Sequence, residues 1–330
     1  MKTALVITSI SPPNNVLRTC AEGCRKHGID FIVMGDRRSP PDFQIDGCDY
    51  WSIERQLDSG VALAQPLPEG HYSRKNLGYL IAMERGAEVI IETDDDNLPL
   101  ESFWDKRSKV HEARRISAAG WVNPYSYFTD ENIWPRGFPL EQIKKTPQIS
   151  EETASSLALI QQGLTDGNPD VDAIYRLTQT LPITFRQELP LALGSTSRAP
   201  FNSQNTTWFS EAFPLLYLPS TCSFRMTDIW RSFIAQRICA ANDWDILFHS
   251  ATVFQERNPH DLMTDFKDEI SGYLGNADIC RKLDELEIKP GVEQVSAGLV
   301  KCYEAFISIG LIDKLEITLL ESWLVSIAGL

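Results

Sequence analysis

The sequence predicts an α/β fold in which helices flank a mostly parallel sheet, followed by a C-terminal helical subdomain. Strand and helix patterns alternate from residue 4 to residue 91, which is typical of βαβ units and a parallel sheet. From residue 261 to residue 330 the pattern is helical throughout. We therefore expect two parts, residues 1–260 and residues 261–330.

The first strand–helix–strand unit occupies residues 4–34. The run ALVITSI predicts a strand, the turn residues SPPNN end it, and a helical pattern covers residues 16–26. A second strand, residues 31–34, is followed by Gly35 and Asp36. In nucleotide-binding α/β domains, a carboxylate at such a strand end contacts a ribose hydroxyl or the base. An aspartate here is equally typical of a turn or a helix cap, so both interpretations of Asp36 remain open.

A helix followed by a buried strand forms the centre of the sequence. Ser73 is suited to cap the start of the helix, and Gly86 is suited to the left-handed residue that ends it. The run VII at residues 89–91 predicts a strand buried on both faces. The apolar helical face consists of Leu77, Leu80 and Ile81.

Arg74 and Lys75 lie in the first turn of that helix. A cation is unfavourable at the positive end of a helix dipole, and a bound phosphate would reverse the penalty. The alternative is a pair of solvated surface charges.

Three consecutive aspartates, Asp94, Asp95 and Asp96, follow the buried strand. In open α/β sheets, ligands bind beyond the carboxyl ends of the strands, which is where these residues lie. Two unit charges about 5 Å apart repel by roughly 1 kcal/mol in water and by roughly 3 kcal/mol at the effective dielectric constant of a protein surface. Carboxylates without neighbouring Cys or His suit Mg²⁺ or Mn²⁺, which leave positions for phosphate oxygens. A solvated acidic loop is the alternative, and the buried strand before it favours the metal site.

The remaining patterns are shorter. Residues 226–241 form the strongest later helix, and strand patterns at 246–248 and 251–254 flank His249. Shorter predicted elements are a strand near residues 50–51, a helix at 53–57 and two strands within 206–219.

Residues 121–139 are rich in aromatic residues, Gly and Pro, which predicts ordered loops at the edge of a pocket. The aromatic residues Trp121, Tyr125 and Tyr127 could either stack on a sugar or pack in the core, and both interpretations remain open. Asp170 and Asp172 precede a helical pattern and are suited to cap it.

The composition is that of a globular protein with a sizeable core: 330 residues, 43% hydrophobic and 23% charged. The net charge of −14 argues against nucleic-acid binding, which needs a basic face. The seven cysteines form no CxxC pair, so we expect reduced and mostly buried thiols. We find neither a signal peptide nor a stretch of ~20 apolar residues able to span a bilayer. This predicts a cytoplasmic protein, with a peripheral position at the inner membrane face as the alternative.

Six motifs, in order along the chain, resemble the STELLO-type glycosyltransferase domain: ITSISPP, MGDRRSPPDF, HYSRKNLGYLIAMERGAEVIIETDDDN, GNPDVDAIYRLT, FRMTDIWRSF and QERNPH. The resemblance covers roughly residues 4–260 and leaves the helices at residues 291–330 outside it. The plant proteins carry a membrane anchor that we do not find here, so the sequence resembles a soluble bacterial-type relative. The third motif is also similar to the RNxG…G…DxD core of family 2 glycosyltransferases.

This resemblance implies a GT-A fold, a nucleotide-diphospho-sugar donor, and Mn²⁺ or Mg²⁺ held by Asp94 and Asp96. The implied donor contacts are Thr8, Ser9 and Asp36 to the nucleoside, Arg74 and Lys75 to the base or diphosphate, and Asp95 elsewhere on the donor. The family pattern makes Asp228, at the start of a later helix, the catalytic base, and His249 the residue that completes the metal site. A helix cap and a structural histidine are the respective alternatives.

We therefore expect a metal-dependent glycosyltransferase that moves a sugar from a sugar-diphosphate donor, with a UDP-sugar as the leading choice. Such a transfer needs the charge of the leaving group neutralised and, for inversion, a base aimed at the acceptor hydroxyl. The expected acceptor is a glycan or lipid-linked glycan in surface polysaccharide synthesis.

Two alternative functions remain. One is a sugar-nucleotide mutase similar to plant reversibly glycosylated proteins, which share a DDD motif. The other is a non-catalytic subunit that organises other glycosyltransferases. The apolar residues of the C-terminal helices either pack in the core or form a homodimer interface.

Overall fold

The computed structural model of the chain describes residues 1–145, 152–256 and 261–330. The strands are β1 Thr3–Thr8, β2 Asp30–Met34, β3 Asp49–Trp51, β4 Val89–Thr93, β5 Asn97–Pro99, β6 Val110–Ile116, β7 Gly120–Trp121, β8 Thr153–Leu157, β9 Ile160–Gly167, β10 Leu191–Leu193, β11 Ser197–Arg198, β12 Asn205–Phe209 and β13 Ile246–Gln255. The α-helices are α1 Asn15–His27, α2 Ile53–Leu57, α3 Lys75–Glu84, α4 Tyr125–Phe128, α5 Ala173–Thr178, α6 Thr227–Ala241, α7 Leu262–Asp284, α8 Val295–Ser308 and α9 Leu315–Ala328. The 3₁₀ helices are η1 Tyr72–Arg74, η2 Glu101–Trp104, η3 Leu140–Gln142, η4 Ser210–Leu216, η5 Phe224–Met226 and η6 Val292–Gln294.

The described strands form an 11-stranded mixed sheet and a small ladder of β11 and β7. The order in the large sheet is β3-β2-β1-β4-β12-β9-β13-β10-β6-β8, and β5 pairs with β13. Strands β3, β2, β1 and β4 are parallel to one another, as the βαβ pattern predicts. Strand β12 is antiparallel to both of its neighbours, β4 and β9. The carboxyl ends of β1, β2 and β4 therefore meet at one edge of the sheet.

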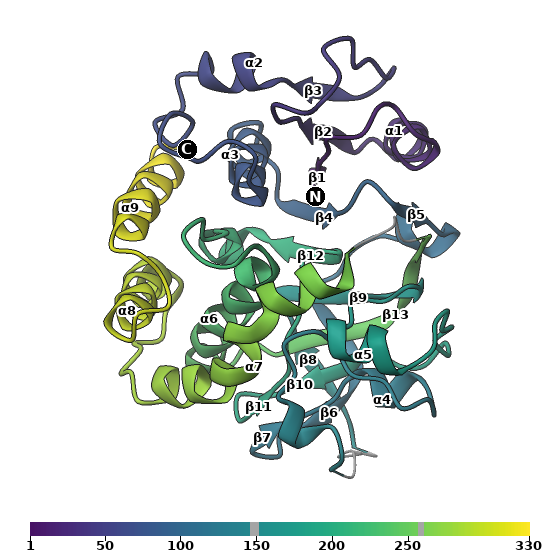
Figure 1. Cartoon of the computed structure of the whole chain (residues 1–330), viewed down its shortest axis with the longest axis vertical. Coiled ribbons are helices and arrows are strands. Elements are labelled where there is room, and N and C mark those ends of the chain that lie inside the picture. The colour runs from purple at the N-terminus through teal and green to yellow at the C-terminus, as the bar shows by residue number, and fades with distance from the viewer. Residues whose placement is uncertain (146–151, 257–260) are drawn as a thin grey trace.

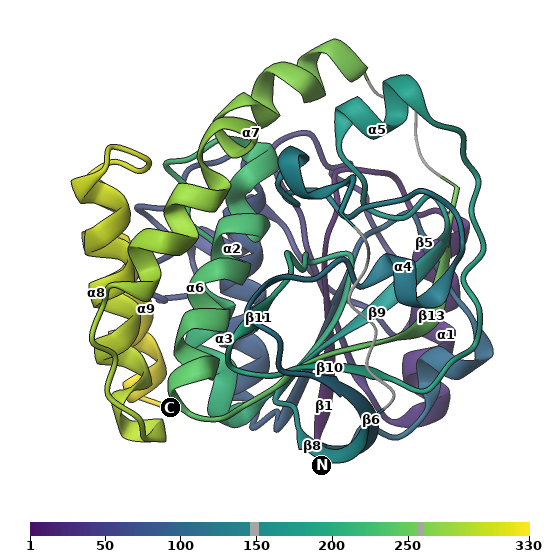
Figure 2. The same ribbon diagram turned by 90° about the horizontal axis from the view of Figure 1, so that it is seen from below.

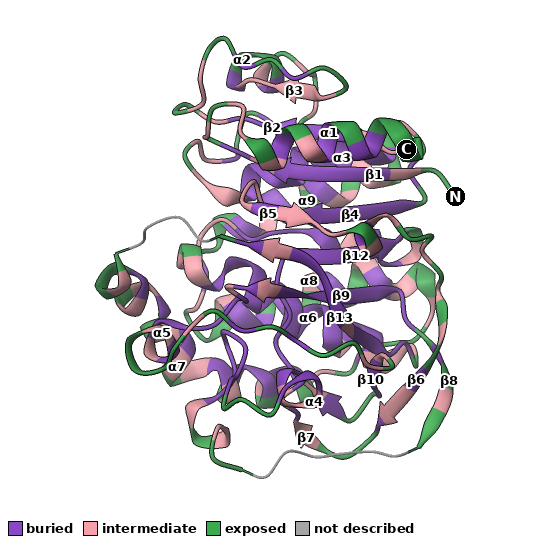
Figure 3. Ribbon diagram, turned by 90° about the vertical axis from the view of Figure 1, so that its right-hand side faces the viewer, coloured by how far each residue is buried: buried purple, intermediate pink, exposed green. Residues whose placement is uncertain are grey.

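Helices cover both faces of the sheet (Figure 1). Helix α3 packs on β1 and β2 from one face, and α1 packs on β2 from the other, as Figure 2 shows. Helix α6 lies on the same side as α3, with α8 and α9 beyond it. The central strands β4 and β12 are buried along their whole length (Figure 3). The predicted α/β sheet with flanking helices and a helical C-terminal region is confirmed.

The first helix, α1, extends one residue beyond the predicted residues 16–26 at each end. Asn14 is the N-cap, and its side-chain oxygen accepts a hydrogen bond from the backbone of Leu17 at 2.9 Å. Gly28 follows the last turn in the left-handed conformation, with φ of 66°. Helix α1 packs on β2 and β5, and the loop that joins it to β1 lies at the carboxyl edge of the sheet.

The start of the central helix differs from its prediction. Ser73 does not cap it, because a single 3₁₀ turn, η1, comes first and α3 begins at Lys75. The side chain of His71 caps this turn instead, accepting a hydrogen bond from the Ser73 backbone at 3.0 Å. Gly86 does have the predicted left-handed conformation, with φ of 79°.

Two strand predictions need correction, and one central strand was not predicted. Residues 206–219 supply one strand, β12, and then the 3₁₀ helix η4, since Pro214 cannot donate to a strand ladder. The two runs that flank His249 are one strand, β13, whose register shifts between His249 and Val253. The central strand β9 has no counterpart in the sequence analysis, because its polar Gln161 and Gln162 do not read as a buried strand.

The C-terminal helices pack on the same core as the sheet. Helix α8 contacts α6, and α9 contacts α3. Trp323 of α9 meets the ring of Tyr79 of α3 edge to face, with centroids 6.5 Å apart. The carboxylate of Glu316, fully buried in α9, accepts hydrogen bonds from the backbone of Ser220 and Thr221 at 2.8–3.0 Å. Trp323 and Glu316 thus have partners within the chain, whereas the homodimer interface and the division at residue 260 stay predictions.

Two expectations concern the chain as a whole. All seven cysteines are free thiols, and five of them are buried, as predicted. Within the described ranges, no helix has the length and apolar character that crossing a bilayer would require.

Candidate active site

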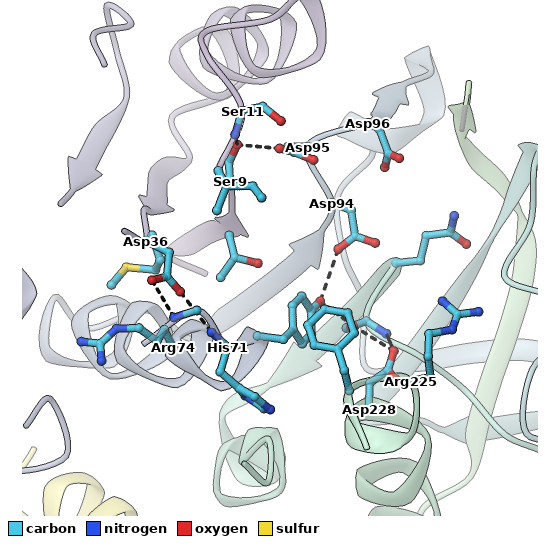
Figure 4. Close-up of a pocket in the computed structure, with 18 of the residues that line it drawn as sticks. Ser9, Ser11, Asp36, His71, Arg74, Asp94, Asp95, Asp96, Arg225 and Asp228 are labelled. Atoms are coloured by element: carbon cyan, nitrogen blue, oxygen red, sulfur yellow. Dashed lines mark hydrogen bonds between the residues drawn. The ribbon is translucent and has the colours of Figure 1, made fainter. Parts of the chain in front are cut away.

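A cavity of about 430 Å³ lies at the carboxyl ends of β1, β2 and β4 (Figure 4). Its size is within the range of small-molecule sites. Eight of the predicted site residues line it: Thr8, Ser9, Asp36, Arg74, Asp94, Asp95, Asp96 and Asp228. Two others, Lys75 and His249, do not line it. The opposite wall comes from the start of α6, η5 and the loop before α5.

Each aspartate of the acidic turn has a different partner. The Asp94 carboxylate accepts a hydrogen bond from the Tyr72 hydroxyl at 3.2 Å. Asp95 accepts one from the Ser9 hydroxyl at 2.5 Å, which ties the turn to the end of β1. Asp96 accepts one from the side-chain amide of Gln255 at 2.9 Å. The turn is therefore held from three elements, and its carboxylates cannot swing apart freely.

Negative charge is in excess at Asp94. Burial raises the pKa of Asp94 to about 7; Lys75 opposes this rise, whereas Asp96, Asp95 and Asp228 add to it. The Lys75 ammonium lies 3.7 Å from Asp94 Oδ1. One cation thus compensates only part of the repulsion among the carboxylates.

Lys75 lies beneath the acidic turn rather than in the cavity. It is fully buried and donates hydrogen bonds to the Tyr72 hydroxyl at 2.8 Å and to the Thr93 carbonyl at 3.0 Å. Its ammonium is also 4.0 Å from the buried Glu92 carboxylate. Burial lowers the pKa of Lys75, while the carboxylates of Asp94 and Glu92 oppose that change. Its position fits support of the turn and does not fit the predicted contact with a donor.

Arg74 also differs from its prediction. Its guanidinium donates to the Gln56 side chain at 2.6 Å and to the carbonyls of Leu67 and Ala64 at 3.0 and 3.3 Å. Burial lowers the pKa of Arg74 because these partners are neutral. The side chain anchors the loop before η1, so its donor groups are not aimed at a phosphate in the cavity.

Asp36 combines the two interpretations left open by the sequence. It lines the cavity, and its carboxylate accepts hydrogen bonds from the backbone of Gly70 at 2.8 Å and His71 at 3.2 Å. It also accepts one from the backbone of Arg37 at 2.7 Å. Asp36 therefore fixes the loop that leads into α3 and leaves its side chain at the cavity wall.

Asp228 belongs to a buried ion-pair cluster on the opposite wall. Nη2 of Arg136 donates to both Asp228 oxygens at 3.0 Å and to Asp170 Oδ2 at 2.7 Å. Asp228 Oδ2 also accepts hydrogen bonds from the Ser203 backbone at 3.2 Å and its hydroxyl at 3.1 Å. Although burial acts against it, Arg136 lowers the pKa of Asp170. Asp228 is therefore fixed by Arg136 and Ser203 and does not cap α6, which has no side-chain cap.

His249 is not brought to the acidic turn. It lies on β13 against Gly163 of β9, and its Nδ1 is 3.0 Å from the Ser250 carbonyl oxygen. Along a strand, the six residues to Gln255 span about 15–20 Å. Burial and the nearby Arg107 lower the pKa of His249 to about 4. Its position agrees with a structural histidine and not with the predicted metal ligand.

Of the two interpretations of the aromatic residues in 121–139, the structure supports packing. The ring of Trp121 lies between Phe138 and Phe233, with centroids 6.0 and 5.6 Å away. Tyr125 is buried against Phe185. None of the three aromatic residues lines the cavity.

The sequence analysis missed several residues of the cavity: Tyr72, Arg136, Ser203, Phe224 and Arg225. Tyr72 and Phe224 lay within quoted motifs, but nothing in their spacing distinguishes them from packing residues. Phe224 is 54% exposed, which is unusual for a phenylalanine beside a pocket. Asp170 lines the cavity, whereas Asp172 caps α5 as predicted, accepting a hydrogen bond from the Tyr175 backbone at 2.7 Å.

The carboxylates of the acidic turn suit a hard divalent cation in an incomplete site. In the part of the chain that the structure describes, no three His, Cys, Asp or Glu side chains converge as a ready-made metal cluster. Mg²⁺ is commonly bound by one or two carboxylates together with substrate phosphates, which fits Asp94 and Asp96. Residues 257–260, the end of the QERNPH motif, lie outside the described residues.

Comparison with known proteins identifies a family whose match includes part of the cavity wall. A family model described as STELLO glycosyltransferases matches residues 225–329. The predicted resemblance to the STELLO glycosyltransferases is confirmed. The STELLO match begins at Arg225 in the cavity wall and continues through α7, α8 and α9. The expectation that the helices at residues 291–330 lie outside the resemblance is therefore wrong, because amphipathic spacing alone does not distinguish one helical family from another.

Two curated relatives from Arabidopsis thaliana are named Probable glycosyltransferase STELLO2 and Probable glycosyltransferase STELLO1. They are 30% and 29% identical to this chain over 232 and 235 residues. Each alignment covers 64% of this chain and 30% of the relative. The chain thus spans less than a third of the length of these STELLO proteins.

Among solved structures, the chain is similar to one described as a mycobacterial protein, with a TM-score of 0.42 and 10% identity over 84% of this chain and 75% of the other. It is also similar to M. tuberculosis glucosyl-3-phosphoglycerate synthase, with a TM-score of 0.42 and 11% identity over 84% of this chain and 81% of the other.

Proposed function

We propose that this chain is a glycosyltransferase domain that moves a sugar from a sugar-diphosphate donor to a hydroxyl of a glycan acceptor. The observation that carries the proposal is the convergence of Asp94, Asp95 and Asp96 with Asp228 in one cavity. The match to the STELLO glycosyltransferases supports the same reaction class. We further propose a nucleotide sugar as the donor and surface polysaccharide synthesis as the setting.

The nucleoside of the donor is proposed to lie beside the ends of β1 and β2. Ser9 and Asp36 line this side, and each is fixed by hydrogen bonds that also position a neighbouring loop. Arg38 lies exposed at the rim and forms no ion pair within the described ranges, so its charge is available to a diphosphate. Arg74 and Lys75 are left out of this role because their donor groups are engaged elsewhere.

Asp94 and Asp96 are proposed to hold Mn²⁺ or Mg²⁺. When bound, such an ion offsets the negative charge that develops on the leaving diphosphate. Lys75 and Gln255 hold the two carboxylates from below and from the side. The excess negative charge at Asp94 supports this proposal because a divalent cation would relieve it.

Asp228 is proposed to take the proton of the acceptor hydroxyl if the transfer inverts the sugar's configuration. Its two oxygens differ: Oδ2 accepts hydrogen bonds from Arg136 and twice from Ser203, whereas Oδ1 accepts one from Arg136. Oδ1 therefore has the capacity left to accept from a substrate hydroxyl. Arg136 and Ser203 would hold the carboxylate in place during this step.

The first test is thermal stabilisation by a panel of nucleoside diphosphates and sugar diphosphates, each with and without Mn²⁺. A ligand at 100 times its dissociation constant stabilises the folded state by about 2.7 kcal/mol. We expect a metal-dependent shift with one donor class in the wild type and none in Asp96→Ala. The absence of a shift with every donor would contradict the proposal and favour a non-catalytic organising subunit.

The products separate transfer from the mutase alternative. Transfer releases free nucleoside diphosphate, whereas a mutase returns the nucleotide still bonded to the rearranged sugar. We expect release of nucleoside diphosphate that depends on the acceptor and falls in Asp228→Asn.

A further inference from the structure

Glu269 is a fully buried carboxylate on α7, a helix that the sequence analysis placed outside the catalytic part of the chain. It accepts hydrogen bonds from the backbone of Ala173 at 2.7 Å and from Nε of Arg225 at 2.9 Å. The Tyr273 hydroxyl also donates to it. A second guanidinium nitrogen of Arg225 lies 2.7 Å from Oε1. Such a set of bonds satisfies a buried charge and fixes its partners in space.

The partners of Glu269 belong to the cavity wall. Arg225 lines the cavity directly. Ala173 is the first residue of α5, and the segment around that helix contributes Asp170 and Arg176 to the same wall. Glu269 therefore joins two wall segments that are about 50 residues apart in the sequence, and it does so from behind, without lining the cavity itself.

Arg225 continues the chain of hydrogen bonds toward the candidate catalytic groups. Its carbonyl oxygen accepts from Nη1 of Arg136, and Nη2 of that arginine holds Asp228. Ser203 links Asp228 to Tyr72: its backbone N–H donates to Asp228 Oδ2 at 3.2 Å, and its hydroxyl oxygen lies 3.1 Å from that carboxylate oxygen and 2.6 Å from the Tyr72 hydroxyl. The Tyr72 hydroxyl donates to Asp94. An unbroken polar network thus runs from α7 to the acidic turn. Figure 4 shows its cavity end, where Arg225 and Asp228 lie across from Ser9 and Asp95.

We propose that Glu269 is a positioning residue of the transfer site, which fixes Arg225 and, through Arg136, sets the place of Asp228. The inference rests on the proposed function and extends it, because it makes α7 part of the catalytic apparatus. It also accounts for a STELLO match that begins at Arg225 and runs on through the C-terminal helices.

The negative charge of Glu269 is what holds the Arg225 guanidinium in the cavity wall. Only 14% of the Arg225 side chain is exposed, and its other nearby carboxylate, Asp265, is 3.9 Å away. In Glu269→Gln the side chain keeps its size but loses the charge, and its amide group meets the donors of Arg225. The guanidinium would then turn toward other acceptors and shift the backbone that Arg136 binds. A displacement of about 1 Å in a catalytic group costs on the order of 100-fold in rate.

A matched control exists on α9. Glu316 is also a fully buried carboxylate of a C-terminal helix, and it accepts hydrogen bonds from Tyr217, Ser220 and Thr221. None of these three residues lines the cavity. Glu316→Gln therefore reports the effect of neutralising a buried carboxylate on stability alone.

The experiment compares wild type, Glu269→Gln and Glu316→Gln with the donor and Mn²⁺ identified by the thermal panel. Donor affinity is measured by calorimetry, and the rate of nucleoside diphosphate release is measured at saturating donor. We expect both variants to have a lower melting temperature. We expect Glu269→Gln alone to lose at least about tenfold in rate, with donor affinity changed less than about twofold.

Equal rates in the two variants would overturn the positioning role, and so would a rate loss in Glu269→Gln fully accounted for by weaker donor binding. If Glu269→Gln does not fold, Glu269→Asp takes its place, because it keeps the charge and shortens the reach by one methylene. The same split, a lower rate with unchanged donor affinity, is expected there. A wild type that neither binds a donor nor releases nucleotide would instead overturn the proposed function.

Discussion

Replacing Asp94 by Asn should make the metal-free protein more stable. Asn keeps the shape of the side chain and can still accept the hydrogen bond from Tyr72, but it removes one of three clustered charges. The pKa of Asp94 is raised from 3.8 to about 7, a net change that already includes the attraction of Lys75. At 1.36 kcal/mol per pKa unit, the charged form would cost about 4 kcal/mol above pH 7. One third of the side chain is exposed, so we reduce this to about 2 kcal/mol for solvent screening.

The sign of the effect sets its pH dependence. Because the folded-state pKa is raised, ionisation of Asp94 reduces stability progressively as the pH rises from about 4 to about 7. The gain in Asp94→Asn should therefore be largest at pH 8 and clearly smaller at pH 5. Urea denaturation of metal-free protein at the two pH values measures it.

Added Mn²⁺ should reverse the order of the two proteins at pH 8. The wild type gains stability from the ion, whereas Asp94→Asn has lost a proposed ligand and gains little. Asp245→Asn is the control, since Asp245 pairs with Arg115 at 2.9 and 3.0 Å and does not line the cavity. That variant should lose stability and keep its response to Mn²⁺. An Asp94→Asn protein that is less stable without metal, or that responds to Mn²⁺ like the wild type, would refute this account of the acidic turn.

Three further predictions concern the packing around the site. His249→Gln should reduce the loss of stability between pH 6.5 and pH 4. In the wild type, the pKa of the buried His249 is lowered, so the unfolded chain binds this proton more readily and His249 should cost about 1.4 kcal/mol of stability per pH unit as the pH falls. Equal slopes of stability against pH in the two proteins, measured by urea denaturation, would contradict this. Arg136→Met should cost about 3–5 kcal/mol, since it leaves the buried Asp228 without its cation; a loss below 1 kcal/mol in the same assay would show that water or another group takes over. Gly78→Ala should destabilise the protein by about 1–3 kcal/mol despite the better helix propensity of alanine, because the new Cβ would lie 2.6 Å from Cγ1 of Val6. A rise in melting temperature would mean that β1 moves to accommodate the methyl group at little cost.

Much of the donor side follows from local sequence signals. A cap such as Asn14 acts within three residues, and the apolar run of β4 needs only its own side chains to predict burial. The parallel pairing of β1 with β4, which brings Ser9 and Asp95 together, appears only in the structure. The sequence alone therefore predicted the acidic turn and its place at the edge of the sheet, but not its contact with Ser9.

The opposite wall was decided only by the tertiary structure. Arg136, Asp170 and Asp228 form one ion-pair cluster, yet they come from two loops and the start of α6, and their spacing carries no periodic signal. Which cation meets which carboxylate depends on the antiparallel strand β12 and on α7, both of which bring distant segments together.

The same limit explains the errors for single residues. A strand pattern gives the face on which His249 lies only if its register is known, and the bulge in β13 changes that register. The position of Arg74 in the first turn suggested a phosphate, but its guanidinium is used by carbonyl groups of a loop that no pattern predicts. By itself the sequence determined the local elements and the charge at the end of β4. Only the tertiary structure decided the partners of each buried charge, because those partners are chosen by contacts between residues far apart in the chain.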